Sequence, residues 1–109
     1  PRLAASSVKW PETPVLLEFS TETCPACRMV EPVLDRLADE YDGRVLFAHV
    51  DAGEQPELAE AFGVRGVPAF ALIRDRSIVD AFVGAQPPAA LRDRLDAVLA
   101  PKPRRRSMG

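Results

Sequence analysis

Between residues 15 and 41 the chain changes abruptly from a short apolar run to a long amphipathic pattern. The run VLLEF (15–19) is interrupted by a single acid and is typical of a buried β-strand. After a short polar stretch, apolar side chains recur with the spacing of a helix that packs one face on a core: Val30, Val33, Leu34, Leu37, Ala38 and Tyr41. A strand that passes directly into an amphipathic helix favours an α/β domain.

The same alternation continues along the chain. Gly43 ends the helix, VLFAHVD (45–51) is predicted to be a second strand, and QPELAEAFG (55–63) a short helix. AFALIR (69–74) and IVDAFV (78–83) are predicted to be strands. Because only a tight turn separates them, we expect an antiparallel hairpin.

A last helix ends before Pro101 and carries its apolar residues on one face: Leu91, Leu95, Val98 and Leu99. The order strand, helix, strand, helix, strand, strand, helix predicts an α/β fold, with a mixed sheet covered by helices on both faces. We expect one domain over residues 15–100. An N-terminal segment (1–14), in which LAASSVKW is interpreted as a short helix, precedes it, and a basic, disordered tail (101–109) follows it.

The charge distribution argues against a nucleic-acid partner. The chain has 109 residues, 47% of them hydrophobic, which is enough for a single core. Four of its 14 basic residues lie in the last nine positions, so the preceding part has ten basic against 16 acidic residues, a net charge of −6. An acidic body is a poor match for a polyanion. The basic tail is interpreted as a solvated chain end.

No apolar run reaches the length of a membrane span and no signal peptide is visible, so we expect no membrane association. Two cysteines in a chain of this length do not make a secreted disulfide framework, which favours a cytoplasmic domain. Because the chain does not begin with Met, a processed leader stays an open alternative.

Both cysteines, Cys24 and Cys27, lie at the junction of the first strand and the long helix. A structural zinc site takes four ligands, and the chain adds only one histidine, His49, on another predicted strand, so we expect no metal. A purely structural disulfide is also disfavoured, because so short a loop removes little entropy from the unfolded chain. Two unrelated buried cysteines would not explain this placement.

The placement instead favours a working redox pair. Pro25 suits the first helical position and Cys24 the cap before it. The free amides and dipole of a helix N-terminus favour the thiolate, which is the form that attacks a disulfide. We therefore expect Cys24 to be the nucleophile and Cys27, one turn inward, to resolve the mixed disulfide.

From Val15 to Leu99 the chain resembles the thioredoxin family. The matching segments are VLLEFSTETCPACRMVEPVLDRLADEY (15–41), AFGVRGVPAF (61–70) and VGA (83–85). The resemblance implies a thioredoxin fold with four or five strands and a protein-disulfide reductase that needs no cofactor. It also implies a monomer that acts on disulfide-containing proteins and is recharged by a reductase such as a thioredoxin reductase.

The resemblance also assigns the substrate-binding residues. The loop VRGVP would place a cis Val67–Pro68 bond, preceded by Gly66, beside the cysteines. The backbone of Val67 would pair with an extended substrate. Val83 and Gly84 would line the far side of the groove.

Glu18 and His49 are the predicted proton-transfer residues. A charge in the middle of an apolar strand is costly unless it has a partner or a role, and Glu18 aligns with the family's buried aspartate beneath the cysteines. Burial would raise the pKa of Glu18 and make it an acid and base near neutrality. His49 aligns where the family often has a lysine, so a Glu18–His49 pair would make activity sensitive to pH around 6 to 7. The alternatives are a Glu18 at an exposed sheet edge and a His49 with no catalytic role.

The chain departs from the family's usual pattern at the cysteine turn. Thr23 stands where a tryptophan usually precedes the first cysteine, and Pro25 and Ala26 replace Gly-Pro between the pair. Less apolar docking surface predicts weaker general reductase activity. The changed dipeptide leaves a disulfide oxidase or isomerase open as an alternative. A non-enzymatic interaction module with a thioredoxin-like surface is a separate alternative. Arg76 falls where a glycine commonly makes the hairpin turn, so a positive φ there would impose mild strain.

Overall fold

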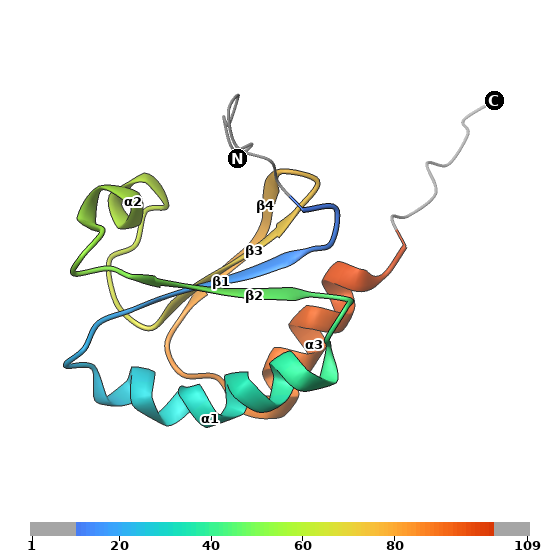
Figure 1. Cartoon of the computed structure of the whole chain (residues 1–109), viewed down its shortest axis with the longest axis horizontal. Helices are drawn as coiled ribbons and strands as arrows, with labels where there is room; N and C mark the ends of the chain where they lie inside the picture. Colours follow the sequence, from blue (N-terminus) through green and yellow to red (C-terminus); the bar gives the residue numbers. More distant parts are fainter. Residues whose placement is uncertain (1–10, 102–109) are drawn as a thin grey trace.

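The computed structural model describes residues 11–101 as one four-stranded sheet with three helices (Figure 1). The strands are β1 (Val15–Ser20), β2 (Leu46–Asp51), β3 (Ala69–Arg74) and β4 (Ser77–Val83), in the spatial order β2-β1-β3-β4. β1 pairs with β2 in parallel and with β3 antiparallel, and β3 and β4 form the expected antiparallel hairpin. The predicted mixed α/β fold is confirmed.

Helices cover both faces of this sheet. α1 (Pro25–Glu40) and α3 (Pro88–Leu99) lie on one face, and the short α2 (Pro56–Ala61) lies on the other (Figure 1). Residues 11–14 lead into β1 without helical structure. The predicted helix over LAASSVKW (3–10) lies outside the described residues, and so does most of the predicted tail.

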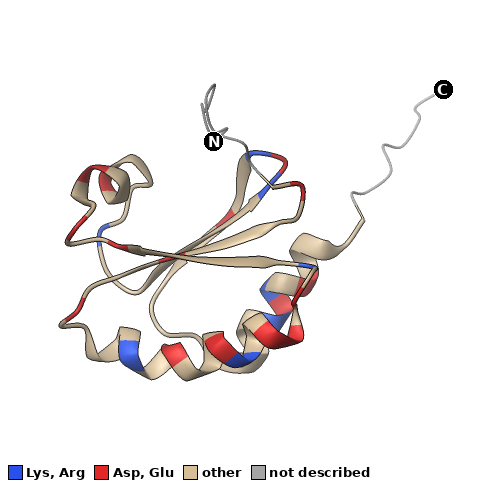
Figure 2. Ribbon diagram, viewed as in Figure 1, with Lys and Arg blue, Asp and Glu red and all other residues tan. Residues whose placement is uncertain are grey.

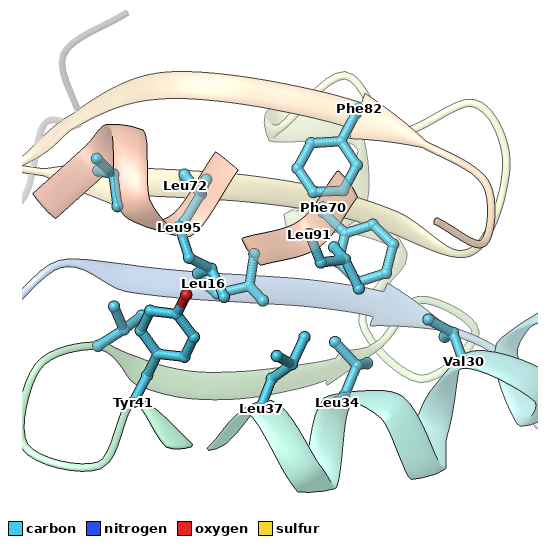
Figure 3. Close-up of a cluster of buried hydrophobic side chains, with 12 residues drawn as sticks. Leu16, Val30, Leu34, Leu37, Tyr41, Phe70, Leu72, Phe82, Leu91 and Leu95 are labelled. Carbon is cyan, nitrogen blue, oxygen red and sulfur yellow. The ribbon is translucent and has the colours of Figure 1, made fainter. Parts of the chain in front are cut away.

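The main core lies between the sheet and the pair α1 and α3 (Figure 3). Alternate residues of β1 and β3 point toward this layer, and two of them, Leu16 and Leu72, are at most 1% exposed. Leu37 of α1 and Leu91 of α3 meet them there, as the helical spacing predicts. A smaller cluster centred on Phe19 packs under α2. Because β1 contributes to both clusters, its position in the sheet is fixed from both sides.

Polar contacts at the rim fix α3 against its neighbours. The Tyr41 hydroxyl donates to Asp96 over 2.6 Å, and Arg74 of β3 donates to the carbonyl of Val98 over 2.8 Å. Burial of the ring and the hydrogen bond to Asp96 raise the pKa of Tyr41 to about 12. Figure 2 shows basic and acidic residues side by side along α1 and α3, where Arg92 pairs with Glu40 over 2.7 Å. These contacts join α3 to the C-terminal end of α1 and to β3.

The β3–β4 hairpin turns on two residues with left-handed backbone, Asp75 (φ 52°) and Arg76 (φ 64°). A two-residue hairpin turn of this kind normally uses glycine, asparagine or aspartate. Arg76 therefore carries the mild backbone strain that its position in the sequence suggested.

Candidate functional site

The cysteine turn, the segment that carries Cys24 and Cys27, lies at the junction of β1 and α1. Cys24 is the N-cap residue of α1, Pro25 is in its first turn, and Cys24 and Cys27 are joined in a disulfide with their Cα atoms 5.2 Å apart. The backbone N–H of Cys27 donates to Sγ of Cys24 over 3.1 Å. A free amide of the helix N-terminus is thus directed at this sulfur. On reduction it would stabilise negative charge on Cys24.

Both cysteines are largely buried. Cys24 is 8% exposed and Cys27 is 5% exposed, so exposure alone barely distinguishes them. The distinguishing feature is the hydrogen bond, which only Cys24 accepts. On the other side of the turn, Arg28 donates to the carbonyl of Glu22 over 3.0 Å and ties the loop before Cys24 to α1.

The loop before β3 lies against Cys24. The Val67–Pro68 peptide bond is cis, and the carbonyl oxygen of Val67 lies 3.7 Å from Sγ of Cys24. Pro68 is fully buried, and its carbonyl accepts the N–H of Gly84 over 2.8 Å. Gly84 has a φ of 97°, a conformation that glycine adopts without strain. The loop and the end of β4 are therefore held together beside the disulfide.

Gly66 and Val83 complete this surface. A Cβ added to Gly66 would lie 3.6 Å from Cγ1 of Val83, so the two residues are in close contact distance. Val83 is 60% exposed, which makes it one of the most exposed large apolar side chains among the described residues. The five residues that the resemblance assigned to substrate binding thus lie together next to Cys24, with Val83 exposed and Pro68 buried.

An open cavity of about 530 Å³ extends this surface toward α2. It is lined by the loop from Gly63 to Val67 and by residues of the β2–α2 segment, among them Ala52, Pro56 and Glu60. Sequence reasoning missed this extension. Nothing in the sequence shows that Ala52 and Pro56, which follow β2, lie beside the loop over residues 63–67, so the cavity could not be predicted from it.

Glu18 lies on β1 with its side chain on the face covered by α1, next to a cavity of about 280 Å³. β1 is an inner strand, so Glu18 does not lie at a sheet edge. Burial raises the pKa of Glu18; Glu31 and Asp35 raise it further, whereas His49 opposes them. A raised pKa makes the Glu18 carboxylate a stronger base than a freely solvated glutamate.

His49 lies on β2 directly opposite Glu18 in the parallel register, with an exposed side chain. Its Nε2 is hydrogen-bonded to the hydroxyl of Ser20, the next residue of β1 on the same face. His49 therefore acts on Glu18 through its charge, and its described hydrogen bond goes to Ser20.

The only grouping of potential metal ligands in residues 11–101 is an acidic trio, Glu22, Asp51 and Glu54. Asp51 already accepts the backbone N–H of Gly53 over 2.8 Å and that of Glu54 over 3.0 Å, so it caps its own turn. Neither cysteine belongs to this trio. Among the described helices, none has the length and apolar character needed to cross a membrane.

The fold and the cysteine turn define a class of protein: an α/β thiol-disulfide oxidoreductase with a dithiol at a helix N-terminus. Residues 5–97 match the family model described as Thioredoxin. The chain is 39% identical to Thioredoxin 1 of Synechococcus elongatus over 83 residues, which cover 76% of this chain and 78% of that protein. It is 35% identical to Thioredoxin 1 of Nostoc sp. over 85 residues, covering 78% and 79%.

Thioredoxin of Chlorobaculum thiosulfatiphilum is 34% identical over 82 residues, covering 75% of this chain and 76% of that protein. The chain belongs to the thioredoxin family. It is a protein-disulfide reductase that acts on disulfide-containing proteins. The predicted fold family and activity are confirmed.

Proposed function

We propose that Cys24 is the attacking thiol of this reductase and Cys27 the resolving thiol. The Cys24 thiolate attacks one sulfur of a substrate disulfide, forms a mixed disulfide, and releases the other substrate sulfur as a thiolate that takes up a proton. Cys27 then loses its proton and attacks Sγ of Cys24, and the second substrate thiolate leaves. The substrate gains two electrons and two protons, and the enzyme holds the Cys24–Cys27 disulfide.

The hydrogen bond from the Cys27 N–H to Sγ of Cys24 carries this assignment. It supports a thiolate at Cys24 before the attack on the substrate disulfide. Cys27 lies inside the first turn of α1, where a large substrate has less access than at the cap.

The substrate peptide is proposed to lie along Gly66, Val67 and Pro68 on one side and Val83 and Gly84 on the other. The exposed apolar side chain of Val83 supports this assignment, as does the position of the Val67 carbonyl beside Cys24. An extended peptide paired with this loop would bring its disulfide to Sγ of Cys24.

Glu18 is proposed to take the proton of the Cys27 thiol during the resolving step, with His49 influencing its charge state. The position of Glu18 under α1 and its raised pKa support this role. We further propose that the protein works as a cytoplasmic monomer and that a thioredoxin reductase restores its dithiol. The chain has only two cysteines, which is not the pattern of a secreted disulfide framework and supports the cytoplasm as the compartment.

Trapping distinguishes the two cysteines. Cys27→Ser, mixed with oxidised insulin as substrate, is expected to accumulate a mixed disulfide through Cys24, because nothing resolves it. Non-reducing electrophoresis with peptide mass mapping measures the adduct. The matched variant Cys24→Ser should give little adduct at equal concentration. An adduct that forms mainly through Cys27 would reverse the assignment.

A further inference from the structure

A cavity between the sheet and α1 joins the half-buried Glu18 to three exposed titratable side chains. Its volume is about 280 Å³. Glu31 and Asp35 of α1 line it together with Glu18 and His49, and the remaining lining is apolar: Leu16, Leu34, Ala38, Phe47 and Ala48. A space of this size with four polar groups at its wall can hold several waters.

The three exposed groups reach Glu18 from two elements. Glu31 and Asp35 are four residues apart on α1, so they lie one above the other on the same helix face. His49 comes from β2, in register with Glu18. From β3, the register partner of Glu18 is the apolar Phe70, so no charge faces Glu18 from that side.

The two α1 carboxylates and the histidine act on Glu18 in opposite directions. Negative charges at Glu31 and Asp35 disfavour a second negative charge nearby and raise the pKa of Glu18, whereas His49 lowers it. An apolar lining weakens the screening of these charges relative to open water. Burial has the largest effect on the pKa of Glu18, and these charges from α1 and β2 add to it or oppose it.

We propose that Glu31 and Asp35 are positioning residues for proton transfer, whose charges at this cavity make Glu18 a stronger base toward the Cys27 thiol. The cavity is the route by which the proton then leaves. During resolution the proton passes from Sγ of Cys27 to the Glu18 carboxylate and from there through water to the solvent. This inference rests on the proposed role of Glu18 in the resolving step.

A direct titration tests the electrostatic part of the inference. Carbon-13 NMR follows the side-chain carboxyl of Glu18 against pH in the oxidised protein, in which the cysteines do not titrate. Glu31→Gln and Asp35→Asn should each lower the titration midpoint of Glu18, and the double variant should lower it further. Asp39→Asn is the matched control: it removes a carboxylate one more turn along α1, outside the cavity lining, and should leave the midpoint unchanged.

Turnover tests the catalytic part. With insulin as substrate and a chemical reductant, the double variant should turn over about two- to fivefold more slowly at neutral pH, with its pH profile displaced to lower pH. In a Glu18→Gln background the same two substitutions should change neither the rate nor the profile. His49→Gln should move the Glu18 midpoint in the opposite direction.

The outcomes separate this inference from the function on which it rests. An unmoved Glu18 midpoint in the double variant would overturn the inference, while Glu18 itself could still be shown to act by its own substitution. A midpoint that moves without any change in the pH profile would show that Glu18 is not the base, and both assignments would fall. If Asp39→Asn shifted the Glu18 midpoint as much as the cavity variants do, the shift would depend only on the net charge of the protein, and the inference would be overturned.

Discussion

Replacing Cys24 with serine is expected to lower the catalysed reduction of insulin by about a thousandfold or more, to the rate of the added reductant alone. A serine hydroxyl is not ionised at neutral pH and cannot form the mixed disulfide. The hydrogen bond from the Cys27 N–H would then stabilise a neutral oxygen, with no chemical consequence. Insulin precipitation in the presence of a fixed amount of reductant measures the rate.

The matched control is Thr23→Ser, one residue earlier in the same turn and exposed. It should retain activity close to the parent, because it leaves the N-cap and both sulfurs in place. If Cys24→Ser kept full insulin-reducing activity with a native circular dichroism spectrum, Cys24 would not be the attacking thiol.

Glu18→Gln is expected to have two opposite effects. Turnover at neutral pH should fall by about tenfold to a hundredfold, because the Cys27 thiol loses its base. Stability at pH 7 to 8 should rise by about 1 kcal/mol, a value reduced for the solvent that reaches Glu18 through its cavity. Insulin reduction and urea unfolding of the oxidised protein measure the two effects separately.

The raised pKa of Glu18 also predicts how the stability effect of Glu18→Gln changes with pH. The raised pKa of Glu18 means that the folded state holds this proton to higher pH than the unfolded state does. Its contribution to stability is fully present below the unfolded pKa and is lost as pH rises through the folded one. The stability gain of Glu18→Gln should therefore grow from pH 5 to pH 8. A stability gain that stays constant over this pH range would contradict a raised pKa of Glu18 in the folded protein.

The sequence predicted the elements well because apolar spacing reports directly on burial. The strand over residues 15–19 and the helix stripe ending at Tyr41 both appear in the structure, with the helix beginning at Pro25. Small differences occur at the ends, where Ser77 joins β4 instead of the turn and α2 ends at Ala61. At element ends hydrogen bonding, not burial, sets the boundary.

The site was less accessible to sequence reasoning. The position of Cys24 at the helix N-cap followed from Pro25 alone, because proline suits the first helical turn. The cavity around Glu18 did not, because Glu31 and Asp35 look like ordinary solvated positions of an amphipathic helix. Similarly, only the register of β2 against β1 shows that His49 lies beside both Glu18 and Ser20.

A reduction potential for the Cys24–Cys27 couple tests the redox assignment itself. Thiol trapping after equilibration in a series of glutathione or dithiothreitol buffers should show one reversible two-electron transition. It should lie nearer the value of about −270 mV that characterises thioredoxin than the roughly −120 mV of a strong disulfide oxidant. A potential near the second value would make the protein an oxidant, and the absence of any reversible transition would contradict a working dithiol at Cys24 and Cys27.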